Sequence, residues 1–463
     1  MSSVQMDSRL RGNDGGESGV VMGRYTAYPE YKDSGVEWLG EVPAAWSIFS
    51  GKRIFKNARR QALPSDPQLA ASQKYGVIPQ NLMMELNDSK VMLALKGTES
   101  FRHIEKNNFV ISLRSFEGGI EHSAYVGCVS PAYTVLSASK VVFYRYYKYL
   151  LKSAPYISAL QASTDSLRDG KSITYEQFGE ILLPLPDHTD QASIANFLDH
   201  ETAKIDTLIE EQQSLIRLLK EKRQAVISHA VTKGLNPQAP MKDSGVEWLG
   251  EVPEHWRNTE IRYITSQMGG GTPSKERLDF WNGNIPWVSP KDMKVDYIED
   301  AQDKITHQAV LESSTKLIPE GSVLIVVRGM ILVHSVPVAL TQKSVTINQD
   351  MKALIPAKGI DGEFLLFFMK GLRHFVLDLV EESAHGTKCL RSEVFERMKI
   401  AIPEYEEQVE IVALLKERLN IIDSLIDDAQ EGTVLLQERR TALISAAVTG
   451  KIDVRHWVAP AEI

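Results

Sequence analysis

The chain has few cysteines and no long apolar run, and each absence excludes a class of protein. Only Cys128 and Cys389 occur in 463 residues, far apart and without metal-type spacing. This argues against a disulfide framework or a zinc site and for a reducing cytoplasm. No segment approaches the roughly 20 consecutive apolar residues that a membrane span requires.

The N-terminus also lacks the apolar core of a signal peptide. Its first 22 residues, MSSVQMDSRLRGNDGGESGVVM, are polar and rich in glycine. We expect residues 1–23 to be a disordered tail, or to be translated from a start codon upstream of the true one, with Met22 as the candidate start.

The motifs of common enzymes are missing too. MGGGTPSK at 268–275 lacks the G-x-x-x-x-G-K-[ST] spacing of a phosphate-binding loop, and H-E-x-x-H, G-x-S-x-G and G-x-G-x-x-G do not occur. We expect this glycine-rich loop to approach the backbone of a partner instead. His385 and Lys388, and the loop from Arg114 to Glu117, have no evident catalytic partners. The chain is therefore predicted to perform no catalysis itself.

What the chain does contain is a long internal repeat. KDSGVEWLGEVP occurs at 32–43 and again at 242–253, and each copy is followed by a tryptophan, Trp46 or Trp256. Similarity returns further on, where 185–211 aligns without a gap with 402–428. A period this long does not fit a solenoid and indicates a duplicated two-part module.

The far end of each repeat is predicted to be a long helix with an apolar stripe. Pro186 and Pro403 precede the two helices, and Gly234 and Gly450 lie near their ends. Apolar residues recur in a heptad pattern, which favours packing of the two helices on each other; packing of each helix on its own domain is the alternative. The expected seam consists of Ile194, Leu198, Ile205, Leu208, Leu215, Leu219 and Val226 in one helix, and Ile411, Leu415, Ile422, Leu425, Leu436 and Leu443 in the other. At about 1.5 Å per residue, such helices would form a spacer of ~60–70 Å.

The two variable regions between the repeated segments are predicted to be mixed α/β domains. Arg114 and Arg328 fall at corresponding places, each at the end of an apolar strand candidate. The expected elements are strands at 107–114, 123–130, 140–147, 321–329 and 343–356, a helix at 363–379, and closing strands near ILLPLP and MKIAIP. The two domains look like diverged copies of one fold, which suggests two binders for two targets.

The fold class that follows is mixed α/β (α+β), internally duplicated. The expected segments are a tail at 1–23, a first start segment at 24–47, a first target domain at 48–186, a central helix at 187–233, a second start segment at 234–256, a second target domain at 257–403, a distal helix at 404–453 and a tail at 454–463.

The charge is distributed unevenly along the chain. The whole chain carries −8, but residues 48–180 hold 17 Lys and Arg against 11 Asp and Glu, and residues 257–400 hold 18 against 18. The acidity lies in the two helical stretches. Such a balance suits a protein that touches DNA only through its globular domains.

The motifs of this chain resemble those of the specificity subunits of type I restriction–modification systems. The resemblance rests on the paired SGVEWLGEVPxxW segments, on SLRSFEGGIEHSAYVGCVSPAY and GGGTPS...WNGNIPWVSPKDM in the domains, and on the two P-[DE]-x-x-[DE]-Q segments that run to R-[QT]-A-[VL]-I-S-x-A-V-T. It covers the chain from Tyr25 to Val454.

The resemblance implies two target-recognition domains, each recognising one half of a split double-stranded DNA sequence, separated by an antiparallel pair of helices. It also implies two modification (methyltransferase) subunits that carry S-adenosylmethionine, and restriction (endonuclease/translocase) subunits that use ATP and Mg. On this view the chain itself binds no cofactor and no membrane, and acts in the cytoplasm.

Recognition of bases requires side chains that reach base edges, typically Arg or Lys on guanine and Asn or Gln on adenine. Candidate DNA contacts are Arg114, Ser115, Tyr133, Arg168 and Lys171 in the first domain, and Thr272, Ser274, Lys275, Arg328, Asn348, Gln349, His385, Thr387 and Lys388 in the second.

Several alternatives stay open at this point. Trp38, Leu39, Trp248 and Leu249 of the repeated twelve-residue segment are candidates for partner docking, and packing against the helices is the competing explanation. The chain as a whole is alternatively a non-catalytic coiled-coil interaction protein whose domains bind protein or glycan, or an enzyme with an unfamiliar site.

Overall fold

The computed structural model describes residues 25–87, 100–163, 173–382 and 386–459. The chain divides into two units, here called unit 1 (Met1–Gln212 with Glu431–Ile463) and unit 2 (Gln213–Gln430). Each of the two long helices contributes one part to each unit.

Unit 1 holds a four-stranded antiparallel sheet with the order β4-β11-β8-β9. Its core is rich in aromatic side chains, among them Phe55 and Phe109, which meet edge to face at 5.4 Å. Its elements are β1 Tyr31–Asp33, β2 Glu41–Pro43, β3 Ser47–Ser50, α2 Gly51–Ile54, β4 Phe55–Asn57, β5 Leu69–Ser72, β6 Gly76–Pro79, α3 Gln80–Asn87, β7 Arg102–Ile104, β8 Phe109–Ile111, α4 Ser115–Gly118, β9 Glu121–His122, β10 Gly127–Val129, β11 Thr134–Ala138, α5 Tyr144–Leu150, α6 Ala154–Ala162, α7 Tyr175–Glu180, β12 Leu182–Leu185 and the first part of α8 His188–Lys233.

Unit 2 holds a five-stranded sheet with the order β16-β23-β20-β21-β18. Its central strand β20, VLIV, is buried throughout, as its continuous apolar sequence predicts. Its elements are β13 Met241–Asp243, β14 Glu251–Pro253, β15 Arg257–Glu260, α9 Ile261–Ile264, β16 Thr265–Gly269, η4 Leu278–Phe280, β17 Trp281–Val288, η5 Pro290–Asp292, β18 Tyr297–Ile298, β19 Asp303–Ile305, α10 His307–Glu312, β20 Val323–Val326, η6 Met330–Val333, β21 Val338–Thr341, β22 Thr346–Ile347, β23 Met351–Pro356, α11 Gly362–Gly371, α12 Arg373–Asp378, β24 Val380–Glu382, β25 Lys388–Leu390, α13 Ser392–Glu396, β26 Lys399–Ile402 and the first part of α14 Tyr405–Val448.

The two sheets are built to one plan, which confirms the mixed α/β class and the internal duplication. In unit 1, β4 pairs with β11, which pairs with the buried strand β8, and β8 pairs with β9. In unit 2, β16, β23, β20 and β21 are paired in the same order, so they correspond to β4, β11, β8 and β9. The closing strands are also confirmed: β12 pairs with β3, and β26 pairs with β15.

One predicted strand is wrong. Residues 140–147, KVVFYRYY, are aromatic and β-branched, but the strand ends at Ala138 and helix α5 begins at Tyr144. Tyr146, Tyr147 and Leu150 are fully buried on α5. Packing of this aromatic face against the core outweighs the strand preference of the individual residues.

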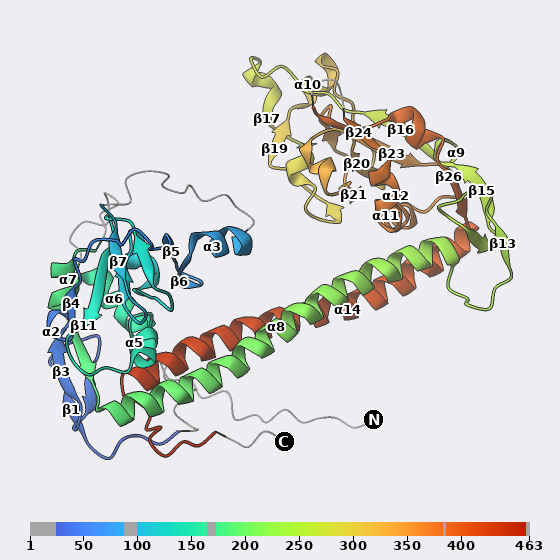
Figure 1. The fold of residues 1–463 in the computed structure, drawn as a ribbon. Helices are drawn as coiled ribbons and strands as arrows, with labels where there is room; N and C mark the ends of the chain where they lie inside the picture. Colours follow the sequence, from blue (N-terminus) through green and yellow to red (C-terminus); the bar gives the residue numbers. More distant parts are fainter. Residues whose placement is uncertain (1–24, 88–99, 164–172, 383–385, 460–463) are drawn as a thin grey trace. The chain divides into compact units, whose positions relative to one another are not determined.

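The long helices α8 and α14 run antiparallel, in green and red in Figure 1. In unit 1, Arg440 donates to Asp206 (Nε–Oδ1 2.7 Å), and in unit 2, Arg223 donates to Asp423 with the same distance. In the alignment of the repeats, Asp206 corresponds to Asp423 and Arg223 to Arg440. The arginine of each repeat therefore forms an ion pair with the aspartate of the other repeat.

Burial along the helices corrects half of the expected seam. One predicted row lies inside or half inside, with Leu198, Ile205, Leu415, Ile422 and Leu443 buried and Leu219, Val226 and Leu436 half-buried. In the other row, Ile194 and Ile411 are buried, but Leu208, Leu215 and Leu425 are exposed.

The second row of the seam lies four residues after the first, not three. Its buried or half-buried members are Thr202, Ile209, Ile216, Arg223, Ala230, Leu419, Ile426, Arg440 and Ala447. The predicted heptad period is correct, but the predicted position of the second row is not. Leu208, Leu215 and Leu425 have the spacing of seam residues, although they are exposed. Arg223 and Arg440 occupy seam positions because each has an aspartate partner there.

The repeated twelve-residue segment forms the same hairpin in both units, with β1 paired to β2 and β13 paired to β14. Each hairpin lies on the end of the long helix that comes from the other repeat. Lys451, after α14, donates to the carbonyl of Glu41 (2.8 Å), and Lys233, at the end of α8, donates to the carbonyl of Leu249 (3.1 Å). Gly450 adopts φ +75°, and a Cβ there would lie 3.0 Å from the Trp46 ring, so this turn requires glycine.

The P-[DE]-x-x-[DE]-Q segments hold each target domain to its long helix. Gln191 accepts a hydrogen bond from the backbone amide of Phe143 (2.7 Å) and donates to the carbonyl of Pro186 (2.8 Å). Gln408 accepts from the amide of Asp361 (2.9 Å) and donates to the carbonyl of Pro403 (3.1 Å). Phe143 and Asp361 are the residues that precede the first turns of α5 and α11. These glutamines are called the glutamine clamps below.

The acidic residue before each clamp binds the tryptophan that follows the hairpin. Trp46 donates its indole N–H to Asp190 (3.4 Å), and Trp256 donates to Glu407 (3.1 Å). Burial, followed by the neighbouring Asp187 carboxylate, raises the pKa of Asp190. His255 is a second partner of Glu407, at 2.8 Å. The repeated Trp and the repeated acid are therefore explained by one contact that each unit makes.

Candidate nucleic-acid interface

The predicted DNA contacts of unit 2 gather at one edge of its sheet. Strand β20 runs towards this edge and β23 runs away from it, since Val326 pairs with Met351, while β16 reaches the edge at Gly269, opposite Lys352. The segment after β20 is fixed there by two bonds, from the amide of Val327 to the carbonyl of Asp350 (2.8 Å) and from the amide of Gly329 to the carbonyl of Lys388 (3.0 Å). Four chain segments thus meet at what is called the recognition edge: 270–275, 327–333, 348–350 and 386–390.

The glycine-rich loop packs against its own chain. A Cβ on Gly271 would lie 2.5 Å from the Ser314 hydroxyl, and one on Gly270 would overlap the Asn348 carbonyl. The carbonyl of Gly271 also accepts hydrogen bonds from the Trp287 indole (2.9 Å) and from the Thr315 hydroxyl (3.0 Å). Gly270 and Gly271 therefore permit a close internal approach, and the expectation that this loop approaches a partner's backbone does not explain them.

Several candidates at the recognition edge are placed to meet a ligand. Arg328 is exposed, and its guanidinium makes no hydrogen bond or ion pair to any residue that the structure describes. Gln349 is exposed and its side-chain oxygen accepts from the Thr272 hydroxyl, while Ser274 and Lys275 lie exposed further along the loop. Lys388 is half-buried and pairs with Glu382 at 2.9 Å, a contact that lowers the pKa of Glu382.

Other candidates of unit 2 do not fit the role. Asn348 is buried and folds its side chain onto the next turn, where it donates to Asp350 (3.2 Å) and accepts the Asp350 amide (3.1 Å). These bonds give Asn348 a structural role in the turn, which contradicts its prediction as a DNA contact. Thr387 is half-buried beside Cys389, and His385 lies outside the described residues.

In unit 1, the turn after β8 occupies the place of the turn after β20. Arg114 is exposed there, with no side-chain partner within the described part of the chain. Ser115 is buried and its hydroxyl accepts the amide of Ser112 (2.8 Å), so the prediction that Ser115 contacts DNA is wrong. Tyr133 is half-buried and packs against a small apolar cluster, and Arg168 and Lys171 lie outside the described residues.

The exposed apolar residues at these two turns were not among the contacts predicted from the sequence. Met330, Ile331 and Val333 are exposed after Gly329, which follows Arg328, and Leu113 is exposed directly before Arg114. In the sequence they continue apolar strands, so their composition indicates core and carries no sign of exposure.

A buried Cys–His–Asp group in unit 1 is a poor candidate for nucleophilic catalysis. His103 lies opposite Cys128 in the β7–β10 pair and its Nδ1 contacts Asp66 at 2.8 Å. Burial raises the pKa of the Cys128 thiol, which keeps it protonated and unreactive. The side chains of all three residues are buried.

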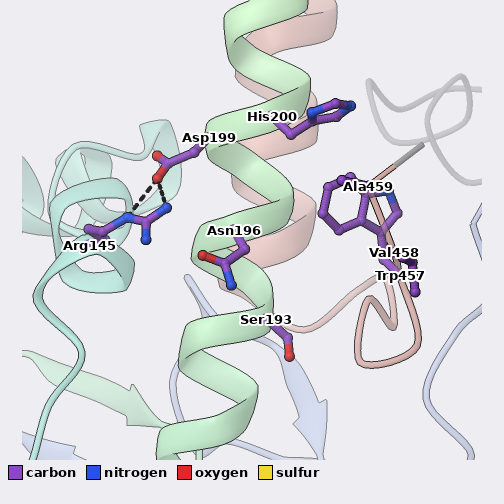
Figure 2. A pocket seen from close by; sticks show the side chains of 8 residues that line it. All are labelled: Arg145, Ser193, Asn196, Asp199, His200, Trp457, Val458 and Ala459. Atoms are coloured by element: carbon purple, nitrogen blue, oxygen red, sulfur yellow. Dashed lines mark hydrogen bonds and ion pairs between the residues drawn. The ribbon is translucent and has the colours of Figure 1, made fainter. Parts of the chain in front are cut away.

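Two hollows lie away from the recognition edge. A hollow of about 620 Å³ in unit 1 is lined by Arg145, Ser193, Asn196, Asp199, His200, Trp457, Val458 and Ala459 (Figure 2). Arg145 and Asp199 bond to each other on one side of α8, while His200 and Trp457 lie together on the other side. A hollow of about 520 Å³ in unit 2 is lined by Val246, Trp248, Leu379, Glu393, Val394, Arg397, Met398 and Lys399.

The hairpin residues proposed for docking are mostly occupied by packing. Leu39 and Leu249 are buried, and Trp38 and Trp248 are half-buried against Tyr156 (5.9 Å between ring centroids) and Phe375 (4.5 Å). Packing therefore accounts for Leu39 and Leu249, while Trp248 also lines the second hollow. None of the helices in the described ranges has the length and apolar character needed to cross a membrane.

Comparison with known proteins agrees with this architecture. The family model of the type I restriction modification DNA specificity domain matches residues 253–428. The specificity subunit of the type I restriction enzyme EcoR124I/EcoR124II of Escherichia coli is 33% identical over 261 residues, which are 55% of this chain and 58% of that protein. The putative type I restriction enzyme MjaX specificity subunit of Methanocaldococcus jannaschii is 22% identical over 448 residues, covering 90% of this chain and 96% of that protein. The match to the Escherichia coli protein thus spans little more than half of its length.

Among solved structures, the HsdS subunit from Thermoanaerobacter tengcongensis shares the fold with a TM-score of 0.54 at 16% identity, over 89% of this chain and 98% of that one. A chain from a study of complex assembly and conformational transition of the type I R-M system gives a TM-score of 0.63 at 17% identity, over 88% and 98%. In its repeated motifs, in the specificity domain matched over 253–428 and in its fold, the chain is similar to the specificity subunits of type I restriction–modification systems.

Proposed function

We propose that the chain is the non-catalytic subunit that determines which DNA sequence a type I restriction–modification complex recognises. It recognises this sequence in two parts, one with each target domain. The observation that carries the proposal is the repeated placement of an exposed arginine whose guanidinium has no partner among the described residues. Arg114 and Arg328 follow the corresponding strands β8 and β20 of two sheets whose four corresponding strands have the same order. Two copies of one fold with different surfaces at the same turn suit two different half-sites.

The chemistry at the recognition edge favours DNA over a protein or a glycan. An arginine donates two parallel bonds to the O6 and N7 of guanine, and a glutamine bonds the N6 and N7 of adenine. Arg328 and Gln349 supply these groups, and Lys275 supplies a cation for a phosphate. The excess of basic residues in 48–180 supports the same role for the first domain.

The partners follow from the same proposal. Two methyltransferase subunits dock on the repeated segments, and restriction subunits join through them, so that the complex methylates or cleaves DNA in the cytoplasm. S-adenosylmethionine, ATP and Mg are held by those partners and not by this chain. Support comes from the identical hairpins, which offer two equivalent surfaces, and from the hollow beside Trp248.

The test is selection of duplexes from a random library by the full chain with its modification subunit, followed by binding titrations of two arginine variants. Arg328→Ala is expected to weaken binding to the selected duplex by about 1–3 kcal/mol and to relax one position of the sequence. Arg373→Ala, at an exposed arginine of α12, is the matched control and should bind as the wild type does. Failure of the wild-type assembly to select any sequence would refute the proposed function.

A further inference from the structure

The recognition edge carries an exposed apolar cluster that its polar residues do not explain. Met330, Ile331 and Val333 of η6 have 65%, 44% and 42% of their surfaces exposed. Aliphatic side chains stay in water at a cost unless a partner covers them. These three residues are called the apolar tip.

The apolar tip is held firmly in place. Leu332, between its members, is buried, and its amide donates to the carbonyl of Gly329 (3.2 Å). Gly329 has φ +130°, a conformation that favours glycine, and its own amide bonds the carbonyl of Lys388. The turn therefore fixes which side chains face outward, so their exposure is a property of the fold.

The surroundings of the tip indicate what covers it. Arg328 lies two residues before Met330, and the carbonyl of Lys388 accepts the amide of Gly329, the residue between them. Gln349 stands on the same edge, in the turn that holds the Val327 and Arg328 amides. A protein partner with an apolar patch would leave the Arg328 guanidinium without a partner among the described residues, whereas the floor of a DNA groove offers both an apolar and a polar contact.

Unit 1 repeats the arrangement with different residues. Leu113 has 50% of its surface exposed and stands beside Arg114 in the corresponding turn after β8. The two target domains have diverged elsewhere, yet both place an exposed apolar side chain within two residues of an exposed arginine at this turn. One coincidence in a single domain would carry little weight, and its recurrence in the duplicate points to a shared role.

We infer that the apolar tip contacts the 5-methyl group of a thymine in the major groove of the half-site recognised by unit 2. The thymine methyl is the one apolar group that the major-groove base edges present, and aliphatic side chains are its usual partners. In this arrangement Arg328 and Gln349 select neighbouring bases by hydrogen bonds, and Met330 and Ile331 select thymine by contact. The inference rests on the proposed DNA recognition and adds a specificity determinant to it.

The test uses the full chain with its modification subunit and the duplex that this assembly selects. Each thymine of the selected sequence is replaced in turn by deoxyuridine, which removes the methyl group alone. One thymine in the unit 2 half-site should lose affinity by about fourfold, the effect of about one buried methylene-sized group. In the variants Met330→Ser and Ile331→Ser, the same replacement should have a smaller effect, because side chain and methyl no longer meet.

Leu311→Ser on α10 is the control, since Leu311 is also strongly exposed but lies outside the recognition edge. It should keep the wild-type response to deoxyuridine. If the wild type selects a sequence but no thymine responds, or if the response persists unchanged in both tip variants, the inference is wrong while DNA recognition stands. If the tip variants lose affinity equally for all duplexes and the bound DNA is no longer kinked, the tip is a wedge between base pairs, which also overturns it. If the wild type selects no sequence, the proposed function itself fails.

Discussion

The glutamine clamps make a sharp prediction about how each target domain is fixed to its long helix. Gln408 is 1% exposed, accepts the Asp361 amide at 2.9 Å, and donates to the carbonyls of Gly359 and Pro403, both at 3.1 Å. Gln408→Met keeps the approximate volume of the side chain but removes all three bonds. A buried donor left without an acceptor costs about 1–3 kcal/mol, so the start of α11 should open more often.

The assay is hydrogen–deuterium exchange of the full chain, followed by mass spectrometry. A loss of about 2 kcal/mol corresponds to roughly 30-fold faster exchange of the amides around 359–364. Gln191→Met should have the same effect around Phe143, because Gln191 makes the equivalent contacts in unit 1. Gln437→Met, at an exposed position of α14, is the matched control and should change neither segment. Wild-type exchange around 359–364 in the Gln408→Met protein would refute the clamp.

Two further predictions concern stability. Gly432 lies inside α14 with open space around its Cβ position, so Gly432→Ala should raise the free energy of unfolding by about 1 kcal/mol. Gly450→Ala should lower it, since φ is +75° and Pro43 and Trp46 occupy the space. In thermal melts, a Gly432→Ala protein no more stable than the wild type would contradict the first expectation, and a Gly450→Ala protein no less stable would contradict the second. Burial, together with the cations Lys148 and Lys106, lowers the pKa of His122 to about 4, so the unfolded chain binds its proton first as the pH falls, and stability is lost between about pH 6.5 and pH 4. Thermal melts of His122→Gln should show a weaker decline over this range, and an unchanged decline would contradict the assignment.

The sequence was sufficient for the duplicated architecture and insufficient for the phase of the long helices. The heptad period follows from spacing alone, but two rows of positions, three and four residues after the first, compete for the second side of the seam. Leu208, Leu215 and Leu425 made the wrong row look apolar, and Arg223 and Arg440 made the correct row look polar. Only the ion pairs with Asp423 and Asp206 explain why an arginine can stand in the seam.

The candidate contacts show a similar division. Arg114 and Arg328 stay predicted contacts, and their exposure after β8 and β20 agrees with the expectation that an arginine ending an apolar strand leaves the core. Ser115 and Asn348 were misassigned because a polar residue at a strand end either meets a ligand or bonds the adjacent backbone, and composition does not distinguish these roles. The apolar tip was missed for the opposite reason, since exposure of an aliphatic residue depends on the turn that presents it.

The repeated twelve-residue segment shows how duplication and packing combine. The segment is identical in both repeats because it forms the same hairpin in each, and this hairpin contacts the end of the long helix of the other repeat. The contact joins Lys451 to the carbonyl of Glu41 in unit 1 and Lys233 to the carbonyl of Leu249 in unit 2. The sequence revealed the repetition, but not that each hairpin serves the other repeat's helix.

The most direct test of the account is an exchange of one target domain. Residues 257–402 would be replaced by the equivalent region of a related chain, so that the paired strands β15 and β26 move together and α14 with its clamp stays in place. The variant would be expressed with its modification subunit, and the methylated sequence would be mapped by single-molecule sequencing. The account predicts that one half of the recognised sequence changes and the other half is retained. A change in both halves, or in neither, would contradict recognition by two independent domains.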